Sequence, residues 1–122
     1  MPEAGLDWRR ARLRKHADYQ RVYQESRRHA SPSMSYFFRA RQDGDPARVG
    51  LTTSRALGGA VERNRMRRRM REAVRLHLAE LPAGIDLVLH PRRTVLAIEF
   101  VRLEREVGGI FRSVAGATGA QR

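Results

Sequence analysis

The sequence predicts an α+β fold, with helices packed on a small sheet inside one domain of 122 residues. Two observations support this prediction. Segments whose apolar residues have helical spacing alternate with short β-type segments, in the order α, β, β, α, β, α. A strand, a helix and a second strand also follow one another, which is the pattern of a βαβ unit. No internal repeat or linker interrupts the sequence, so we expect residues 1–122 to form a single domain.

The N-terminal segment is predicted to be a basic arm followed by a helix. Residues 1–15 have no apolar period, so we expect a loose arm, with residues 1–11 flexible. Helical spacing then predicts a helix from Ala17 to about Arg28, with His16 at its N-cap. Its apolar face is formed by Tyr19, Val22 and Tyr23.

Two strands are predicted next. Residues 34–40 are rich in aromatic side chains, and residues 48–53 form a second β-type segment. Between them, residues 42–46 contain Asp, Gly and Pro, which favour a turn. We therefore expect these strands to pair as an antiparallel hairpin. Residues 29–33 leave room for one further short strand.

The C-terminal half is predicted to contain a helix, a strand and a helix. The first helix follows the Gly58-Gly59 loop and continues to residue 81, before Pro82. Residues 85–89 are typical of a buried strand, which Pro91 ends or places at an edge. Apolar residues at helical spacing predict the last helix over residues 97–114, although two internal glycines weaken the signal. Residues 115–122 are expected to be flexible.

The helix that begins near Arg63 is crowded with arginine on one side. Its core-facing stripe, an arc of about 100°, contains Met66, Met70, Ala73, Val74 and His77. The opposite row contains Asn64, Arg68, Arg71 and Arg75, flanked by Arg65, Arg67 and Arg69. Like charges four residues apart repel each other, so a polyanion explains this face better than solvent alone. Because arginine suits bidentate contact with phosphate and stacking on bases, we interpret this as a nucleic-acid-binding helix.

The composition agrees with that interpretation. The chain has 25 Lys and Arg against 13 Asp and Glu, a formal charge of +12, which favours nucleic acid or an anionic membrane surface as partner. Cysteine is absent, and no apolar run reaches the ~18 residues of a membrane span. We expect a soluble, cytoplasmic protein with no membrane partner. No pattern of nucleophile and base, paired carboxylates or metal ligands stands out, so we expect no catalytic or metal-binding residue.

Taken together, these features resemble the protein-subunit family of bacterial ribonuclease P over roughly residues 12–112. The resemblance is an ordered series of motifs, which makes it specific. The series consists of Arg12-Leu13-Arg14, DYQRVY at 18–23, RVGL at 48–51, Ser54-Arg55, Gly58, Ala60-Val61, Arg63-Asn64-Arg65 with Arg68 and Arg71, Asp86, Arg92, and the helix from Phe100 to Phe111. The sequence departs from the usual family pattern at Tyr19, Tyr23, Ala56, Gly59 and Pro91.

The resemblance implies both a fold and a function. The implied fold has three helices on a four-stranded mixed sheet (αβββαβα), as in certain ribosomal proteins, with a left-handed βαβ crossover. The implied function is that of a ribonuclease P protein subunit, which binds the catalytic RNA and the 5′ leader of precursor tRNA and assists removal of the leader. Catalysis would belong to the RNA, which would also hold most of the Mg²⁺. No obligate protein partner is implied.

The resemblance also implies roles for particular residues. Arg63, Asn64, Arg65, Arg68 and Arg71 match the family's signature helix and are expected to bind the catalytic RNA. The same role is expected for Arg67 and Arg75 from their place on the helix, and for Arg55 as an extension of the basic surface. Residues expected to form a cleft for the single-stranded leader are Tyr19, Tyr23 and Phe37, together with Arg14 and Arg92. Considered without the resemblance, two tyrosines on one helix face are more often core residues.

Three other functions remain to be compared with this one. A generic or ribosomal RNA-binding protein would need the basic helix but not an aromatic cleft for a single strand. A membrane-surface helix is disfavoured because the apolar face lacks Trp and Phe and is needed for the sheet. A protein nuclease is disfavoured because the chain lacks a catalytic constellation.

Overall fold

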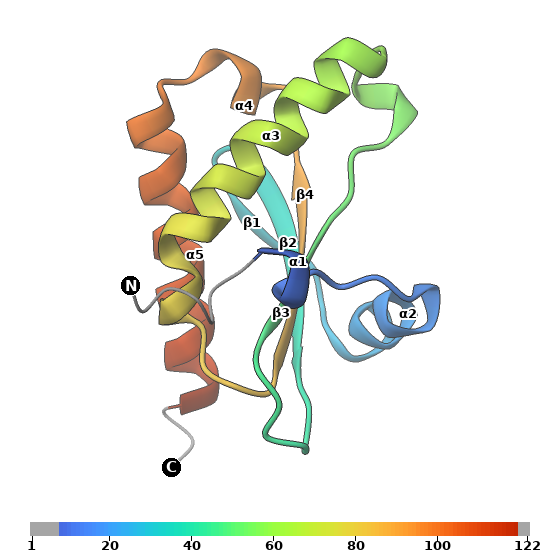
Figure 1. Cartoon of the computed structure of the whole chain (residues 1–122), viewed down its shortest axis with the longest axis vertical. Coiled ribbons are helices and arrows are strands. Elements are labelled where there is room, and N and C mark those ends of the chain that lie inside the picture. The colour runs from blue at the N-terminus through green and yellow to red at the C-terminus, as the bar shows by residue number, and fades with distance from the viewer. Residues whose placement is uncertain (1–7, 120–122) are drawn as a thin grey trace.

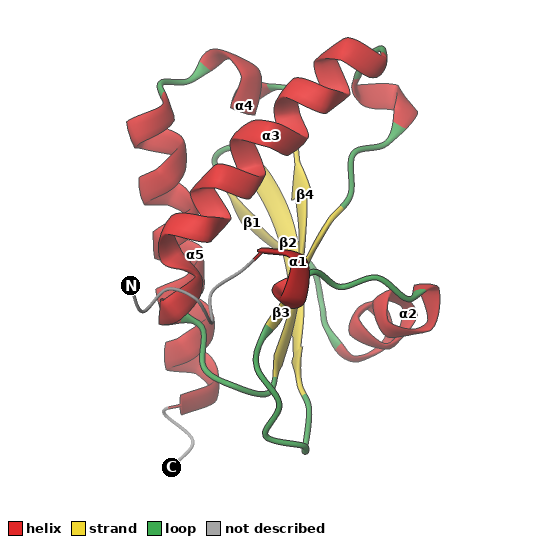
Figure 2. Ribbon diagram, viewed as in Figure 1, coloured by secondary structure: helices red, strands yellow, loops and turns green. Residues whose placement is uncertain are grey.

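The computed structural model describes residues 8–119 and confirms the predicted α+β architecture. Figure 1 shows a sheet with α3 and α5 on one side and α2 on the other, and Figure 2 separates helices from strands by colour. The helices are α1 (Trp8–Ala11), α2 (His16–Glu25), α3 (Ala60–His77), α4 (Thr94–Ala97) and α5 (Phe100–Gly119). The strands are β1 (His29–Ser31), β2 (Met34–Ala40), β3 (Arg48–Leu51) and β4 (Ile85–Pro91). Two 3₁₀ turns, η2 (Arg55–Leu57) and η3 (Leu78–Glu80), flank α3.

The sheet has four strands in the order β1-β2-β4-β3, so the predicted hairpin of β2 and β3 is wrong. Instead, β4 lies between them, antiparallel to β2 and parallel to β3. Neighbouring strands are only about 4.8 Å apart, so the connection over residues 41–47 is long enough to pass one strand. The predicted βαβ unit is β3, α3 and β4, and the predicted short strand is β1.

Several element boundaries differ from the sequence-based expectation. Helix α2 begins at His16 with Lys15 as its N-cap, and it ends at Glu25 because Ser26 adopts an extended conformation. The Ser26 hydroxyl accepts a hydrogen bond from the Phe38 amide at 3.1 Å, which ties this turn to β2. Helix α5 continues through Gly108 and Gly109 to Gly119, and a break at residues 98–99 separates it from α4.

The glycine at position 108 has a packing reason. An added Cβ there would lie 2.6 Å from the His77 ring, so only glycine allows α3 and α5 to approach this closely.

Residues 8–15 are packed against the sheet, in contrast to the loose arm expected from the sequence. Arg12 forms a parallel bridge with Val49 of β3, and the Leu13 amide donates a 2.9 Å hydrogen bond to the Val49 carbonyl. Leu13 itself is buried. Since β3 is an edge strand, this segment occupies hydrogen-bonding groups that would otherwise be open. The remaining residues expected to be flexible, 1–7 and 120–122, lie outside the described part of the chain.

The side chains of β4 alternate between two separate cores. Ile85, Leu87 and Leu89 pack with α3 and α5 in the larger core. Val88 faces the other way and forms a small cluster with Leu13 and Val22, against which Tyr19, Tyr23 and Phe37 are partly buried. Within residues 8–119, only α2 and the segment that precedes it cover this second face, which leaves part of the sheet open.

Candidate nucleic-acid interface

Helix α3 has the two faces that the sequence predicts. Met66, Met70, Ala73 and Val74 are fully buried. The opposite side is exposed, and we call it the arginine face; it consists of Asn64, Arg65, Arg68, Arg71 and Arg75. Arg75 is paired with Glu72 at 2.5 Å. The side chains of Arg65, Arg68 and Arg71 have no hydrogen-bond or ion-pair partner among residues 8–119, so most of this positive charge is not neutralised by the described protein.

Three other α3 arginines contact the protein itself. Arg63 donates to the Gly58 carbonyl at 3.1 Å, and Arg67 donates to the Thr53 hydroxyl at 2.6 Å. Arg69 donates to the Val95 carbonyl at 2.8 Å and also to that of Ile98. The expectation that Arg69 flanks the RNA-facing row is therefore wrong, because its guanidinium joins α3 to α4.

Glu62, an acidic residue in the first turn of α3, is bound by neighbouring groups of the protein. Glu62 accepts a hydrogen bond from the Gly59 amide at 3.0 Å and pairs with Arg93 at 3.2 Å. The hydrogen bond from Arg93, followed by that from the Gly59 amide, lowers the pKa of Glu62. Arg55, in the turn before α3, is exposed and unpaired among the described residues. The start of the helix therefore adds to the basic surface.

The open sheet face carries a row of three neighbouring residues, Phe37, Val88 and Gly50, on β2, β4 and β3. The Tyr23 ring meets Phe37 edge-on with centroids 5.1 Å apart, and its hydroxyl lies 2.8 Å from His90 Nε2. Tyr19 lies over Gly50, where an added Cβ would be 2.6 Å from the Tyr19 hydroxyl oxygen. The missing side chain at position 50 is therefore what makes room for Tyr19.

A hollow opens beside Phe37 at one end of this row, and we call it the aromatic cleft. Tyr23, Phe37 and His90 contact one another there, and Arg28 and Arg92 provide its positive charge. Both arginines donate to the Ser35 hydroxyl, at 3.0 and 3.3 Å. Burial, and then the charge of Arg28, lowers the pKa of His90, which favours a neutral ring at neutral pH. The cleft thus combines uncharged aromatic surfaces with two cations.

The five residues predicted to form one leader cleft are divided between two hollows. Phe37 and Arg92 line the aromatic cleft, which Tyr23 adjoins. Arg14 and Tyr19 instead line a second hollow at the β3 edge, which we call the edge pocket. Its principal residues are Trp8, Arg12, Arg14, Tyr19, Arg67 and Arg71. The predicted residues therefore lie at two neighbouring hollows, and Tyr19, Tyr23 and Phe37 pack against one shared apolar cluster.

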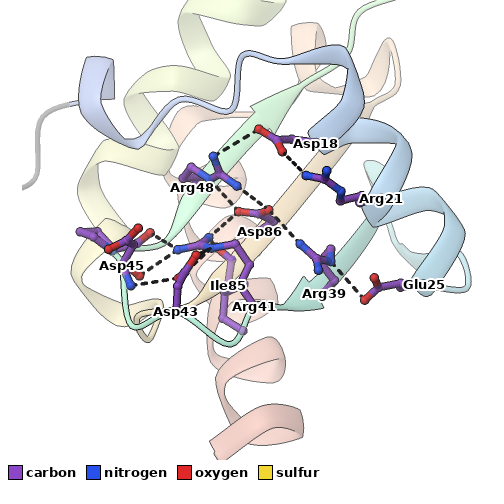
Figure 3. Close-up of polar contacts among 11 residues, drawn as sticks. Asp18, Arg21, Glu25, Arg39, Arg41, Asp43, Asp45, Arg48, Ile85 and Asp86 are labelled. Carbon is purple, nitrogen blue, oxygen red and sulfur yellow. Dashed lines mark hydrogen bonds and ion pairs between the residues drawn. The ribbon is translucent and has the colours of Figure 1, made fainter.

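Buried ion pairs occupy the other end of the sheet face (Figure 3). Asp86 is fully buried and binds Arg41 at 2.5 Å and Arg48 at 2.9 Å, with Arg39 at 3.7 Å. Arg48 also reaches Asp18 of α2 at 3.2 Å. Because guanidinium groups surround its carboxylate, Asp86 acts as a structural anion. Among the described residues, no group of three or more His, Asp or Glu side chains could hold a metal ion.

Comparison with known proteins agrees with this geometry. The model of the ribonuclease P family matches residues 8–115. The chain belongs to this family. A ribonuclease P protein component of Gluconacetobacter diazotrophicus is 42% identical over 90% of this chain and 95% of its own length. One from Chloroflexus aurantiacus is 42% identical over 83% and 75%. A solved Staphylococcus aureus ribonuclease P protein mutant shares the fold, with a TM-score of 0.74 at 24% identity over 88% and 89% of the two chains.

The function follows from the family. Most of the chain is related to ribonuclease P protein components, and its function is participation in ribonuclease P activity, the endoribonuclease activity of tRNA processing. No helix among residues 8–119 is long and apolar enough to cross a membrane.

Sequence reasoning missed Arg28, His90 and Trp8 as candidate site residues. Arg28 lies between α2 and β1, and its position opposite Ser35 depends on how that turn folds. His90 is one of four histidines without a motif. Its alternation with Val88 on β4 was the available signal, since residues two apart on a strand share a face.

Proposed function

We propose that this chain is the protein component of a ribonuclease P whose RNA subunit carries out the cleavage of precursor tRNA. In this proposal α3 binds the catalytic RNA, and the open sheet face holds the single-stranded 5′ leader. The observation that carries the proposal is that one small domain has both an open aromatic cleft and an arginine face on which Arg65, Arg68 and Arg71 have no ion-pair partner among residues 8–119. The site of action would be the cytoplasm, with RNA as the obligate partner.

The arginine face suits a folded RNA. Contacts between guanidinium groups and phosphates fix position without reading sequence, and A-form RNA is recognised mostly by shape and backbone. Arg65, Arg68 and Arg71 form no ion pair with any carboxylate among the described residues. Their binding to phosphate therefore breaks no ion pair of the described protein.

The aromatic cleft suits an unpaired strand of variable sequence. Stacking of a base on an aromatic ring contributes ~1–3 kcal/mol and tolerates every base. Phe37 and the neutral His90 offer such surfaces, and Arg28 and Arg92 lie where they can contact the backbone phosphates of the same strand. A protein that must accept many different leaders needs this tolerance.

The chemistry of the side chains supports catalysis by RNA. The buried carboxylate of Asp86 is enclosed by arginines, and Glu62 and Glu72 are paired with Arg93 and Arg75. These groups do not fit Mg²⁺, which prefers free carboxylates, phosphates and water. We propose that RNA phosphates hold the Mg²⁺ and that the basic protein surface helps by reducing repulsion between the catalytic RNA and its substrate.

Binding of precursor tRNA by the reconstituted holoenzyme tests the leader cleft. Affinity should increase as the leader is lengthened from none to about ten nucleotides, and Phe37→Ala should remove about tenfold of the gain. Affinity for tRNA without a leader provides the control and should not change. Equal losses with and without a leader would mean that Phe37 does not contact the leader. Binding of RNA without any leader effect would favour a generic RNA-binding protein.

A further inference from the structure

We propose that the edge pocket binds one unpaired RNA nucleotide, with its base against Trp8 and its phosphate between Arg12 and Arg71. This inference rests on the proposed function, because the nucleotide would come from the precursor leader or from an unpaired segment of the catalytic RNA. It adds a binding site, at the edge of β3, to the aromatic cleft on the sheet face.

The position of the pocket depends on the packed N-terminal segment. Arg12 and Leu13 lie along the exposed edge of β3, joined to it at Val49. The same packing places α1 beside β3, so that Trp8 faces residues from α2 and α3. The pocket therefore opens where the helix on one sheet face meets the helix on the other.

The charges around the pocket call for an anion. Four arginines line the pocket: Arg12, Arg14, Arg67 and Arg71. None of them forms an ion pair with any residue among 8–119. Arg14 and Arg67 are held in place by hydrogen bonds, to the Arg9 carbonyl at 2.9 Å and the Thr53 hydroxyl at 2.6 Å. Such a convergence of like charges is stabilised when a phosphate enters.

The aromatic groups of the pocket suit a base. Trp8 is only partly buried against the larger core. Its indole N–H is shielded from solvent and has no acceptor among the described residues, which costs free energy until an acceptor arrives. Across the pocket, Tyr19 is held by a 3.2 Å hydrogen bond to the Leu13 carbonyl. An unpaired base offers both a stacking surface and carbonyl or ring-nitrogen acceptors.

The pocket also connects the two surfaces of the proposed function. Arg71 belongs to the arginine face, whereas Tyr19 packs in the cluster that supports Tyr23 and Phe37. A strand that passes from α3 to the sheet face would therefore cross the β3 edge at this pocket.

The single tryptophan of the chain provides a direct test. We would record Trp8 emission of the full-length protein while adding bacterial ribonuclease P RNA, and then precursor tRNAs with leaders of zero to twelve nucleotides. Stacking predicts quenching of Trp8. Quenching on addition of catalytic RNA assigns the nucleotide to that RNA, and quenching that needs a leader assigns it to the substrate. Unchanged emission in both steps, while RNA binding is intact, would overturn the proposal.

Variants separate this site from the aromatic cleft. For whichever RNA quenches Trp8 emission, Trp8→Ala should lower the affinity about tenfold. Trp8→Phe should retain most of the wild-type affinity. Arg12→Gln should reduce the salt slope by roughly 0.7, whereas Arg105→Gln on α5 should not. If Trp8→Ala loosens α1, Trp8→Phe and Arg12→Gln still provide the test. Full affinity in Trp8→Ala with normal Phe37 dependence would refute the edge pocket and leave the proposed function standing.

Discussion

At the scale of single residues, the arrangement of the open sheet face depends on the absence of a side chain at Gly50. Gly50 lies under the Tyr19 ring, and no larger residue fits there without moving it. The hydroxyls of the two tyrosines are also held by hydrogen bonds, since Tyr19 donates to the Leu13 carbonyl and the Tyr23 hydroxyl contacts His90 Nε2. These hydrogen bonds satisfy the phenol hydroxyls of Tyr19 and Tyr23, two positions at which the sequence departs from the usual family pattern.

Gly50→Ala should therefore displace Tyr19. Overpacking of this kind costs about 1–3 kcal/mol of the free energy of unfolding, and it should weaken precursor tRNA binding about as much as Tyr19→Ala does. Urea unfolding and filter binding measure the two effects. Gly109→Ala is the matched control, because an added Cβ there meets no atom within 4 Å. If Gly50→Ala binds normally, Tyr19 does not need its observed position.

At the scale of elements, α3 joins the exposed arginine face to a core-facing stripe, and its turns place successive arginines on different sides. Arg68 is exposed and unpaired among the described residues, whereas Arg69 donates to two backbone carbonyls. Adjacent arginines of one helix thus have different tasks.

Arg68→Ala and Arg69→Ala should therefore behave as opposites. Arg68→Ala should weaken RNA binding and reduce the salt slope by roughly 0.9, with stability changed by less than about 0.5 kcal/mol. Arg69→Ala should leave the salt slope of RNA binding nearly unchanged. It should lower the free energy of unfolding by about 1–3 kcal/mol, because the partly buried carbonyls of Val95 and Ile98 lose their hydrogen-bond donor. Salt titrations and denaturant unfolding of both variants decide this. Equal slopes in the two variants would remove Arg68 from the phosphate contacts.

The joint between α3 and α5 should depend on pH. His77 lies 2.5 Å from both Glu80 and Glu104, and Arg112 also pairs with Glu80. Burial lowers the pKa of His77, but the hydrogen bonds and charges of the two glutamates outweigh it, so the pKa is raised. A raised folded pKa means that the stabilisation is complete below the ordinary histidine pKa, about 6.5, and is lost as pH rises through the folded value.

Comparison of the wild type with His77→Gln measures this contribution. The difference in free energy of unfolding should be largest in acid, below the ordinary histidine pKa, and should shrink as pH increases. A difference that is constant over the titration range of His77 would show that the ring contributes through packing alone.

At the scale of the whole molecule, the sequence predicted the features that depend on the local spacing of apolar residues, such as helix faces. It did not predict the features that depend on residues far apart in the chain, such as strand order. The buried stripe of Met66, Met70 and Val74 follows from helix geometry alone. The pairing of β4 between β2 and β3 does not, since the β-type segments gave no signal for partner choice. For the same reason the inward turn of Arg69 could not be predicted, because the carbonyls it binds come from residues 26 and 29 positions later.

The candidate site shows the same division. Its residue types were predictable from the resemblance, but the separation of Tyr19 from Phe37 into two hollows depends on the N-terminal segment packing at the β3 edge. That segment has no periodic apolar pattern, so Trp8 could not be placed near Arg71 before the structure was known.

Asp86 connects the sheet across three strands and, through Arg48, to α2. Asp86→Ala would leave Arg41 buried without its anion, so the free energy of unfolding should fall by about 3 kcal/mol or more. Thermal and urea unfolding report this loss. The fraction that remains folded should bind RNA normally, and a specific loss of RNA affinity in folded protein would contradict the structural role of Asp86.

The central claim is best tested by cleavage of a precursor tRNA by bacterial ribonuclease P RNA at low Mg²⁺, with and without this protein. We predict that the protein stimulates cleavage at the mature 5′ end, that the protein alone does not cleave, and that Tyr23→Ala reduces stimulation only when the leader is long enough to reach the aromatic cleft. Tight, salt-dependent RNA binding without stimulation would contradict the account, as would robust cleavage by the protein without RNA.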